Sequence, residues 1–190
     1  MSREPTVPQI LQSVGLPGDF LEHLLRESDW SLVIKLHAVF ESVLASLIVQ
    51  RLATPQTAEV VSHLEFNNAK SGKVAFARAL GLLESRDVAF LRGLSELRNQ
   101  LVHRIENISF TFSRCVAGHS AAERKKFKKE FGFAILQVEG GTREYEQLLK
   151  NRPRTIVHLA AYECLLNIQF RVSAQRRNAL VEALLQRSKK

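Results

Sequence analysis

The 190-residue chain contains few of the residues that cross-link a fold or break a helix. Its two cysteines, Cys115 and Cys164, form no Cys-x-x-Cys pair, which argues against both a disulfide framework and a zinc site. Five prolines and nine glycines leave long stretches without a helix breaker. We therefore expect two reduced thiols in apolar surroundings, no metal and no cofactor.

Long uncharged runs are also absent. A membrane span needs about 18 apolar residues, whereas the longest candidate, residues 38–50, is shorter and contains Glu41. Residues 1–15 are polar and contain proline, unlike a signal peptide. We expect a cytoplasmic protein with no membrane partner.

The composition indicates a globular, basic protein. Hydrophobic residues make up 45% of the chain, enough for one domain with a real core. The net charge of +8 and the pI of about 9.9 favour anionic partners, and RNA is the first candidate. Charge alone does not identify that partner.

Hydrophobic periodicity predicts an all-α fold of about six or seven helices without a sheet. The clearest stripe follows Asp29, a candidate N-cap, and continues toward Pro55. Further helices are expected over residues 57–66, 73–83 and 86–105, the last with Ser85 as its cap. Residues 107–112 should form an extended connection.

The second half of the chain has its own helical signals. Ser120 and Glu123 have the spacing of a capping box at the start of a basic helix, and residues 142–190 are helical throughout. We divide the chain into an N-terminal lead-in (1–26), a helical core (27–112) and a basic C-terminal helical extension packed on that core (113–190).

Three polar residues near the end of the helix over 86–105 have the chemistry to act on a phosphate. Asn99 and His103 are four residues apart and share a face, whereas Arg98 lies about 140° from His103. Arginine binds phosphate through a planar fork, histidine transfers protons near neutral pH, and asparagine can orient either. The alternative is an exposed helix that merely carries polar residues.

The order Arg98-Asn99-x-x-x-His103 resembles the signature of HEPN proteins. A wider stretch, about residues 27–105, resembles the branch related to the mannitol operon repressor. The matching segments are residues 27–29 (ESD) before a long apolar helix with Glu41, residues 71–83 (SGKVAFARALGLL), and residues 94–103 (LSELRNQLVH).

This resemblance implies a HEPN-type helical bundle that forms a homodimer through its signature helices. It implies metal-independent RNA cleavage or RNA binding, with His103 as the acid/base residue, Arg98 at the phosphate and Asn99 orienting the pair. A toxin or defence effector with an antitoxin partner would fit. The alternative is a non-catalytic transcriptional regulator or protein-interaction module, like the repressor relatives.

Two residues within the first apolar helix could support this site. A carboxylate in a broad apolar stripe is costly unless it is paired, so we expect Glu41 to pair with Arg98. Alternatively, Glu41 lies in solvent at the edge of the stripe or pairs locally with Lys35 or His37. His37, four residues earlier, shares the face of Glu41, although a single helical histidine is more often structural.

A basic segment is the other candidate contact with nucleic acid. Between residues 114 and 130 there are six basic and two acidic residues, a net charge of +4. Such a helix can follow a phosphate backbone, but a solvated amphipathic face would have the same pattern. The candidate contacts are Arg124, Lys125, Lys126, Lys128 and Lys129.

Overall fold

The computed structural model describes residues 6–103 and 105–187, and every regular element in these ranges is a helix. The all-α prediction is therefore confirmed for the described residues, which form eleven α-helices instead of the expected six or seven. The helices are α1 (Val7–Ser13), α2 (Phe20–Leu24), α3 (Asp29–Leu52), α4 (Thr57–His63), α5 (Lys73–Ala79), α6 (Ser85–Val102), α7 (Phe112–Ala117), α8 (Ala121–Phe131), α9 (Phe133–Leu136), α10 (Gly141–Asn151) and α11 (Pro153–Arg187), with a 3-10 helix, η1, at Ile105–Ser109.

The start of α3 differs by one residue from the prediction, with consequences for packing. Ser28, not Asp29, is the N-cap, because its hydroxyl accepts from the backbone N–H of Ser31 at 3.1 Å. Asp29 instead accepts from the backbone N–H of Phe112 at 2.8 Å and pairs with Arg154 at 3.3 Å. The carboxylate therefore ties α3 to both α7 and α11.

The end of α3 confirms the sequence signal. The helix stops at Leu52, Ala53 adopts a left-handed conformation with φ of 52°, and Pro55 follows two residues later. By length and composition α3 could span a membrane. Its apolar face, however, packs inside the bundle against α4, α5 and α6, and this burial accounts for its apolar composition.

α6 begins and ends earlier than the sequence predicts. Its N-cap is Glu84 in place of Ser85, in a capping box with Asp87, whose carboxylate accepts from the backbone N–H of Glu84 at 2.8 Å. The helix ends at Val102, so His103 is its C-cap residue and the predicted extension to residue 105 is wrong.

The C-terminal half is more finely divided than expected. The extended connection predicted over residues 107–112 is wrong: η1 reaches Ser109 and α7 already begins at Phe112. The capping box of Ser120 and Glu123 is confirmed at the start of α8. Gly132 separates α8 from α9, and the stretch predicted to be helical throughout from residue 142 is divided at Arg152 into α10 and α11.

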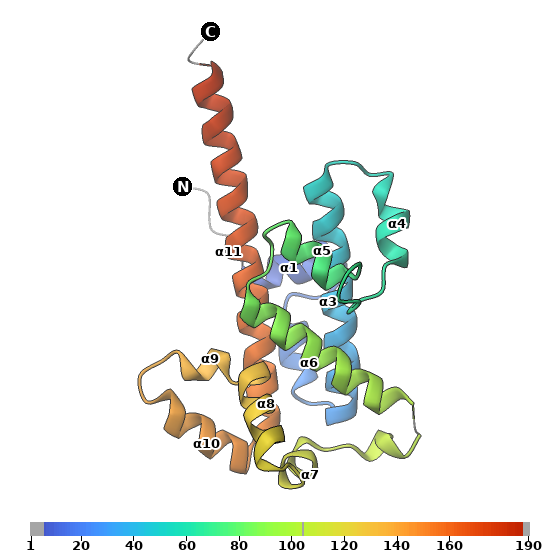
Figure 1. Ribbon diagram of the computed structural model, residues 1–190, viewed down its shortest axis with the longest axis vertical. Coiled ribbons are helices and arrows are strands. Elements are labelled where there is room, and N and C mark those ends of the chain that lie inside the picture. Colours follow the sequence, from blue (N-terminus) through green and yellow to red (C-terminus); the bar gives the residue numbers. More distant parts are fainter. Residues whose placement is uncertain (1–5, 104, 188–190) are drawn as a thin grey trace.

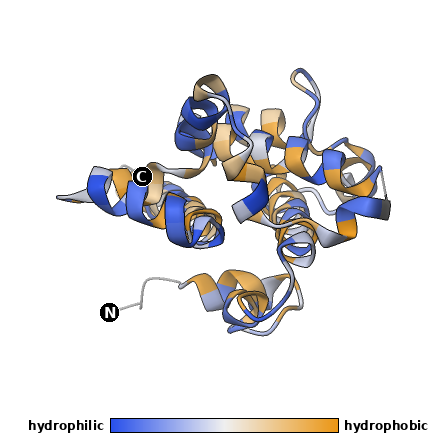
Figure 2. Ribbon diagram, turned by 90° about the horizontal axis from the view of Figure 1, so that it is seen from below, coloured by the Kyte–Doolittle hydropathy of each residue, from blue (hydrophilic) through white to orange (hydrophobic). Residues whose placement is uncertain are grey.

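One apolar cluster runs through the bundle from Val7 in α1 to Val172 in α11. Both the first 26 residues and the segment after residue 112 contribute to it. Figure 1 shows α11 passing beside α6, α8 and α9, and its C-terminal half extending beyond the other helices. Figure 2 shows apolar and polar stripes alternating around individual helices, as expected for amphipathic elements.

Candidate functional site

Three segments that are distant in the sequence line one pocket of about 380 Å³. The last turns of α6 supply Arg98 and Asn99, the middle of α3 supplies His37 and Glu41, and the segment after α4 supplies Glu65 to Asn67. The packing of α3 against α6 therefore brings together four of the five residues that the sequence predicted for this site and its support.

Arg98 and Asn99 present their polar groups at the outer side of this pocket. Arg98 is half-buried, Asn99 is exposed, and an Nη atom of Arg98 donates to Oδ1 of Asn99 at 3.1 Å. This bond holds the guanidinium from one side. The other N–H groups of the guanidinium fork and the amide nitrogen of Asn99 supply further donors.

His103 is the predicted residue that the pocket does not include. It follows the last residue of α6 and is exposed to solvent. His103 keeps helical backbone angles, with φ of −80° and ψ of −10°, but it lies one turn beyond Asn99 and past the residues that line the pocket. A ligand must reach past the pocket to touch this imidazole.

The predicted pairing of Glu41 with Arg98 is wrong, because Glu41 pairs with Lys73. Nζ of Lys73 lies 2.8 Å from Oε1 of Glu41 and also donates to the carbonyls of Ser62 at 3.1 Å and Leu64 at 2.7 Å. The Lys73 side chain is only 3% exposed, so these three acceptors satisfy an otherwise costly buried ammonium group.

His37 forms the inner wall of the pocket. Its ring packs on Phe66 with centroids 4.3 Å apart, and Nδ1 lies 4.0 Å from a carboxylate oxygen of Glu41. Burial lowers the pKa of His37, the nearby Glu41 charge opposes this, and the charges of Arg98 and Lys73 lower it further. This lowered pKa favours the neutral form of the His37 ring.

The basic residues of α8 fall into two groups. Lys126 pairs with Glu96 at 2.6 Å, and Lys128 pairs with Glu146 at 3.4 Å and lies over the Tyr145 ring. The remaining members, Arg124, Lys125 and Lys129, are exposed. The two paired lysines therefore link α8 to α6 and α10, although Lys126 is itself exposed.

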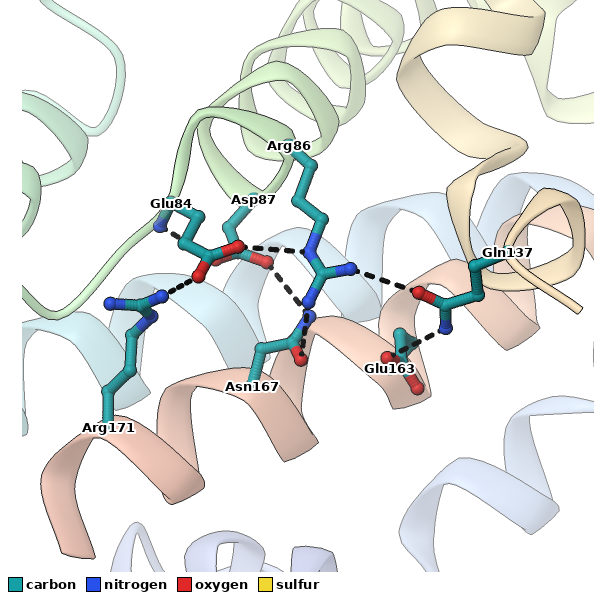
Figure 3. Close-up of polar contacts among 7 residues, drawn as sticks. All are labelled: Glu84, Arg86, Asp87, Gln137, Glu163, Asn167 and Arg171. Atoms are coloured by element: carbon teal, nitrogen blue, oxygen red, sulfur yellow. Dashed lines mark hydrogen bonds and ion pairs between the residues drawn. The ribbon is translucent and has the colours of Figure 1, made fainter. Parts of the chain in front are cut away.

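A second polar cluster lies at the opposite end of α6 (Figure 3). Arg86 donates to Gln137 at 3.0 Å and to Asn167 at 3.1 Å, and it pairs with Glu84 at 3.3 Å. Glu84 also pairs with Arg171 of α11. The cluster therefore joins the start of α6 to α11 and to the turn after α9.

Asp87 lies beneath this cluster and is fully buried. It accepts from Asn167 at 3.3 Å, in addition to capping α6, and it contacts the thiol of Cys164. Burial raises the pKa of Asp87 to about 6, while the bond from Asn167 and the charge of Arg86 oppose the shift. Burial likewise raises the pKa of Cys164, which is consistent with an unreactive structural thiol.

Sequence reasoning missed Lys73 and Asp87. A signal was present for both, because each is a charged residue next to an apolar stripe: Lys73 precedes Val74 and Ala77, and Asp87 lies three residues before Phe90. Their partners, however, come from distant elements and could not be named from spacing. Within residues 6–103 and 105–187, no three His, Cys, Asp or Glu side chains gather as metal ligands.

Comparison with known proteins gives no relative: no family model, no curated protein and no solved structure matches this chain. The site must be interpreted from its own geometry.

Proposed function

We propose that the pocket between α3 and α6 binds the backbone of single-stranded RNA, and that the protein is an RNA-binding protein of HEPN type. The observation that carries this proposal is the meeting of Arg98 and Asn99 with His37 and Glu41 around one pocket of about 380 Å³. The net charge of +8 supports a polyanionic ligand.

The two sides of the pocket suit the two parts of a nucleotide. Arg98, oriented by Asn99, presents a charged fork of donors for a phosphate. Glu41 and His37 of α3 and Glu65 after α4 line the same pocket and offer acceptors that suit the amino groups of a base, and the two carboxylates repel phosphate. Unpaired RNA bases expose such edges, whereas duplex RNA does not.

Cleavage without a metal is a finer proposal that depends on His103. The imidazole would have to reach the phosphate held by Arg98, yet on one chain it lies beyond the end of α6 and outside the pocket. An RNA strand that crosses from the pocket to the end of α6, or a second subunit, would have to join the two. The position of His103 also favours a second candidate function, a non-catalytic regulator that binds its ligand in the same pocket.

The exposed members of the α8 segment would add nonspecific attraction. Lys125 and Lys129 are exposed on a helix packed against α6, and Lys126 ties the two helices through Glu96. We propose that they raise the local concentration of RNA without selecting a sequence.

A binding titration in EDTA tests the proposal. Arg98→Ala should weaken binding of a labelled single-stranded RNA by about ten-fold and reduce the dependence on salt by about one phosphate contact. Arg143→Ala, an exposed residue of α10, makes the same charge change away from the pocket and should leave affinity within about two-fold of the wild type. Equal losses of RNA affinity in both variants would show that only net charge matters, and this would overturn the assignment of the pocket.

A gel assay on the same RNA separates binding from cleavage. If the protein cuts RNA in EDTA, His103→Ala should abolish cleavage while binding persists. If the wild-type protein leaves bound RNA intact, the regulator is the better description. Neither result affects the test of Arg98.

A further inference from the structure

α11 exposes a row of large apolar side chains along one face. Leu159 is 39% exposed, Phe170 is 56% exposed and Val181 is 49% exposed. Tyr162 and Leu180 are also exposed, at 37% and 61%, along one edge of the same row. Exposed apolar residues scattered singly are ordinary, whereas these share one side of a single helix over 23 residues.

This row lies on the side of α11 opposite to the residues that face α3. Successive residues of a helix are about 100° apart, so Leu159 and Val181, each eleven positions from Phe170, lie within about 20° of it. The opposite face contains Val172 and Gln175, which line a cavity next to α3, and Gln175 donates to the carbonyl of Leu80 at 3.2 Å. The exposed apolar residues therefore lie on the side of α11 that faces away from α3.

Two charged residues lie in the same row. Glu163 and Arg177 are each seven positions from Phe170, so they too fall within about 20° of its direction. Glu163 is half-buried and Oε1 accepts from Gln137 at 3.0 Å, while Arg177 is exposed. A carboxylate accepts several hydrogen bonds, so Glu163 can also receive a guanidinium.

The order of these residues is self-complementary about Phe170. Leu159 and Val181 are equidistant from it in opposite directions, and so are Glu163 and Arg177. When two copies of the helix lie antiparallel with Phe170 at the two-fold axis, leucine faces valine and glutamate faces arginine, each pair twice. A parallel pair in register would instead place glutamate against glutamate and arginine against arginine.

We propose that a second copy of this chain docks antiparallel on the outer face of α11, centred on Phe170. The C-terminal half of α11, which Figure 1 shows extending beyond the bundle, then lies along the partner's N-terminal half of the same helix. Burial of the apolar row stabilises the pair, and the two Glu163–Arg177 contacts select its direction and register. Symmetry requires only one self-complementary patch.

This interface is separate from the signature-helix pairing that the resemblance implies. The residues that form it belong to α11, whereas Arg98, Asn99 and His103 lie at the far end of α6. It stands without RNA binding, and failure of the RNA titration would leave it untouched.

Charge reversal combined with light scattering after size exclusion tests the proposal. The wild-type chain should be a dimer at micromolar concentration. Glu163→Arg and Arg177→Glu should each weaken self-association by at least ten-fold, since both contacts become repulsive. Arg26 is an exposed residue before α3, and Arg26→Glu makes the same charge change as Arg177→Glu at a site away from this face of α11. This variant should remain dimeric.

Mixing the two variants is the decisive arm. In a mixed pair both contacts join arginine to glutamate, so an equimolar mixture of Glu163→Arg and Arg177→Glu should recover the dimer. Circular dichroism verifies that each variant is folded. A wild-type chain that stays monomeric to high micromolar concentration, a dimer that Arg177→Glu leaves intact, or folded variants that do not recover on mixing would each overturn the proposal.

Discussion

The two ends of α6 carry similar polar residues, but those at its start are bonded to other helices, whereas those at its end lie beside an open pocket. At its start, Arg86 and Asp87 are surrounded by partners from α11 and from the turn after α9. At its end, Arg98 donates a hydrogen bond to its neighbour Asn99, and His103 is exposed. An arginine whose donors already have protein acceptors stabilises the fold, whereas one beside an open pocket is available to a ligand.

Packing explains the difference. α11 runs along the N-terminal part of α6 and brings Asn167 and Arg171 to it, as Figure 3 shows. Arg98 and Asn99, at the other end of α6, line an open pocket instead. The comparison therefore predicts that substitutions at the first end change stability and that substitutions at the second end change binding.

The largest effect should come from Lys73, the buried partner of the pocket residue Glu41. Lys73→Met leaves Glu41 and the carbonyls of Ser62 and Leu64 without their buried donor, and it should lower the free energy of unfolding by about 3 kcal/mol. Urea denaturation measures the change. Lys70→Met, an exposed neighbour, should differ from the wild type by less than about 0.5 kcal/mol. Equal stability of the two variants would contradict the role of Lys73 as the buried donor to these three acceptors.

Matched substitutions at the two ends of α6 test the comparison directly. Arg86→Ala removes contacts to Gln137, Asn167 and Glu84 and should cost about 2 kcal/mol of folding stability. Arg98→Ala should cost less than about 0.5 kcal/mol while it weakens RNA binding. The same denaturation experiment on both variants decides the point, and similar losses in stability would remove the distinction between the two ends.

The buried carboxyl of Asp87 predicts a dependence of stability on pH. Its pKa is about 6 in the folded chain against an ordinary value of 3.8, so the folded state holds the proton more tightly than the unfolded state. This contribution to stability is present below about pH 4 and is lost as the pH rises through about 6. Asp87→Asn should flatten that part of the profile in urea titrations. Glu139→Gln, at an exposed position, should keep the wild-type slope, and an unchanged slope in Asp87→Asn would refute the assignment.

The smallest effect is expected on α8. Replacing both Lys125 and Lys129 with alanine should weaken RNA binding at low salt only, with a slope reduced by about 0.7 for each lost phosphate contact. Removing the paired Lys126 and Lys128 should instead lower stability slightly, by less than about 1 kcal/mol. Binding and melting measurements on the two double variants would separate these roles. A larger loss of RNA binding after removal of Lys126 and Lys128 would contradict this assignment of roles.

Much of the secondary structure could be predicted from the sequence because it depends on local rules. Helical periodicity located α3 and α6, and the capping box of Ser120 and Glu123 located the start of α8. The predicted helix ends were less accurate, because neighbouring side chains can each cap a helix. The N-cap is Ser28 instead of Asp29 in α3, and Glu84 instead of Ser85 in α6.

The candidate site was predicted in part. Periodicity placed Arg98 and Asn99 on one helix and His37 and Glu41 on another, and the structure brings these four around one pocket. The partner of Glu41 was wrong because it comes from α5, across a loop whose path no spacing rule specifies.

The sequence by itself therefore determined an all-helical, basic chain with a polar segment at the end of one helix, because periodicity, capping and charge act over a few residues. Only the tertiary structure decided which of its charged groups are satisfied. Lys73 and Arg86 find their acceptors across long separations in the chain, whereas Arg98 lines an open pocket. That outcome depends on which helices pack together, a property of the whole bundle that local residue patterns do not contain.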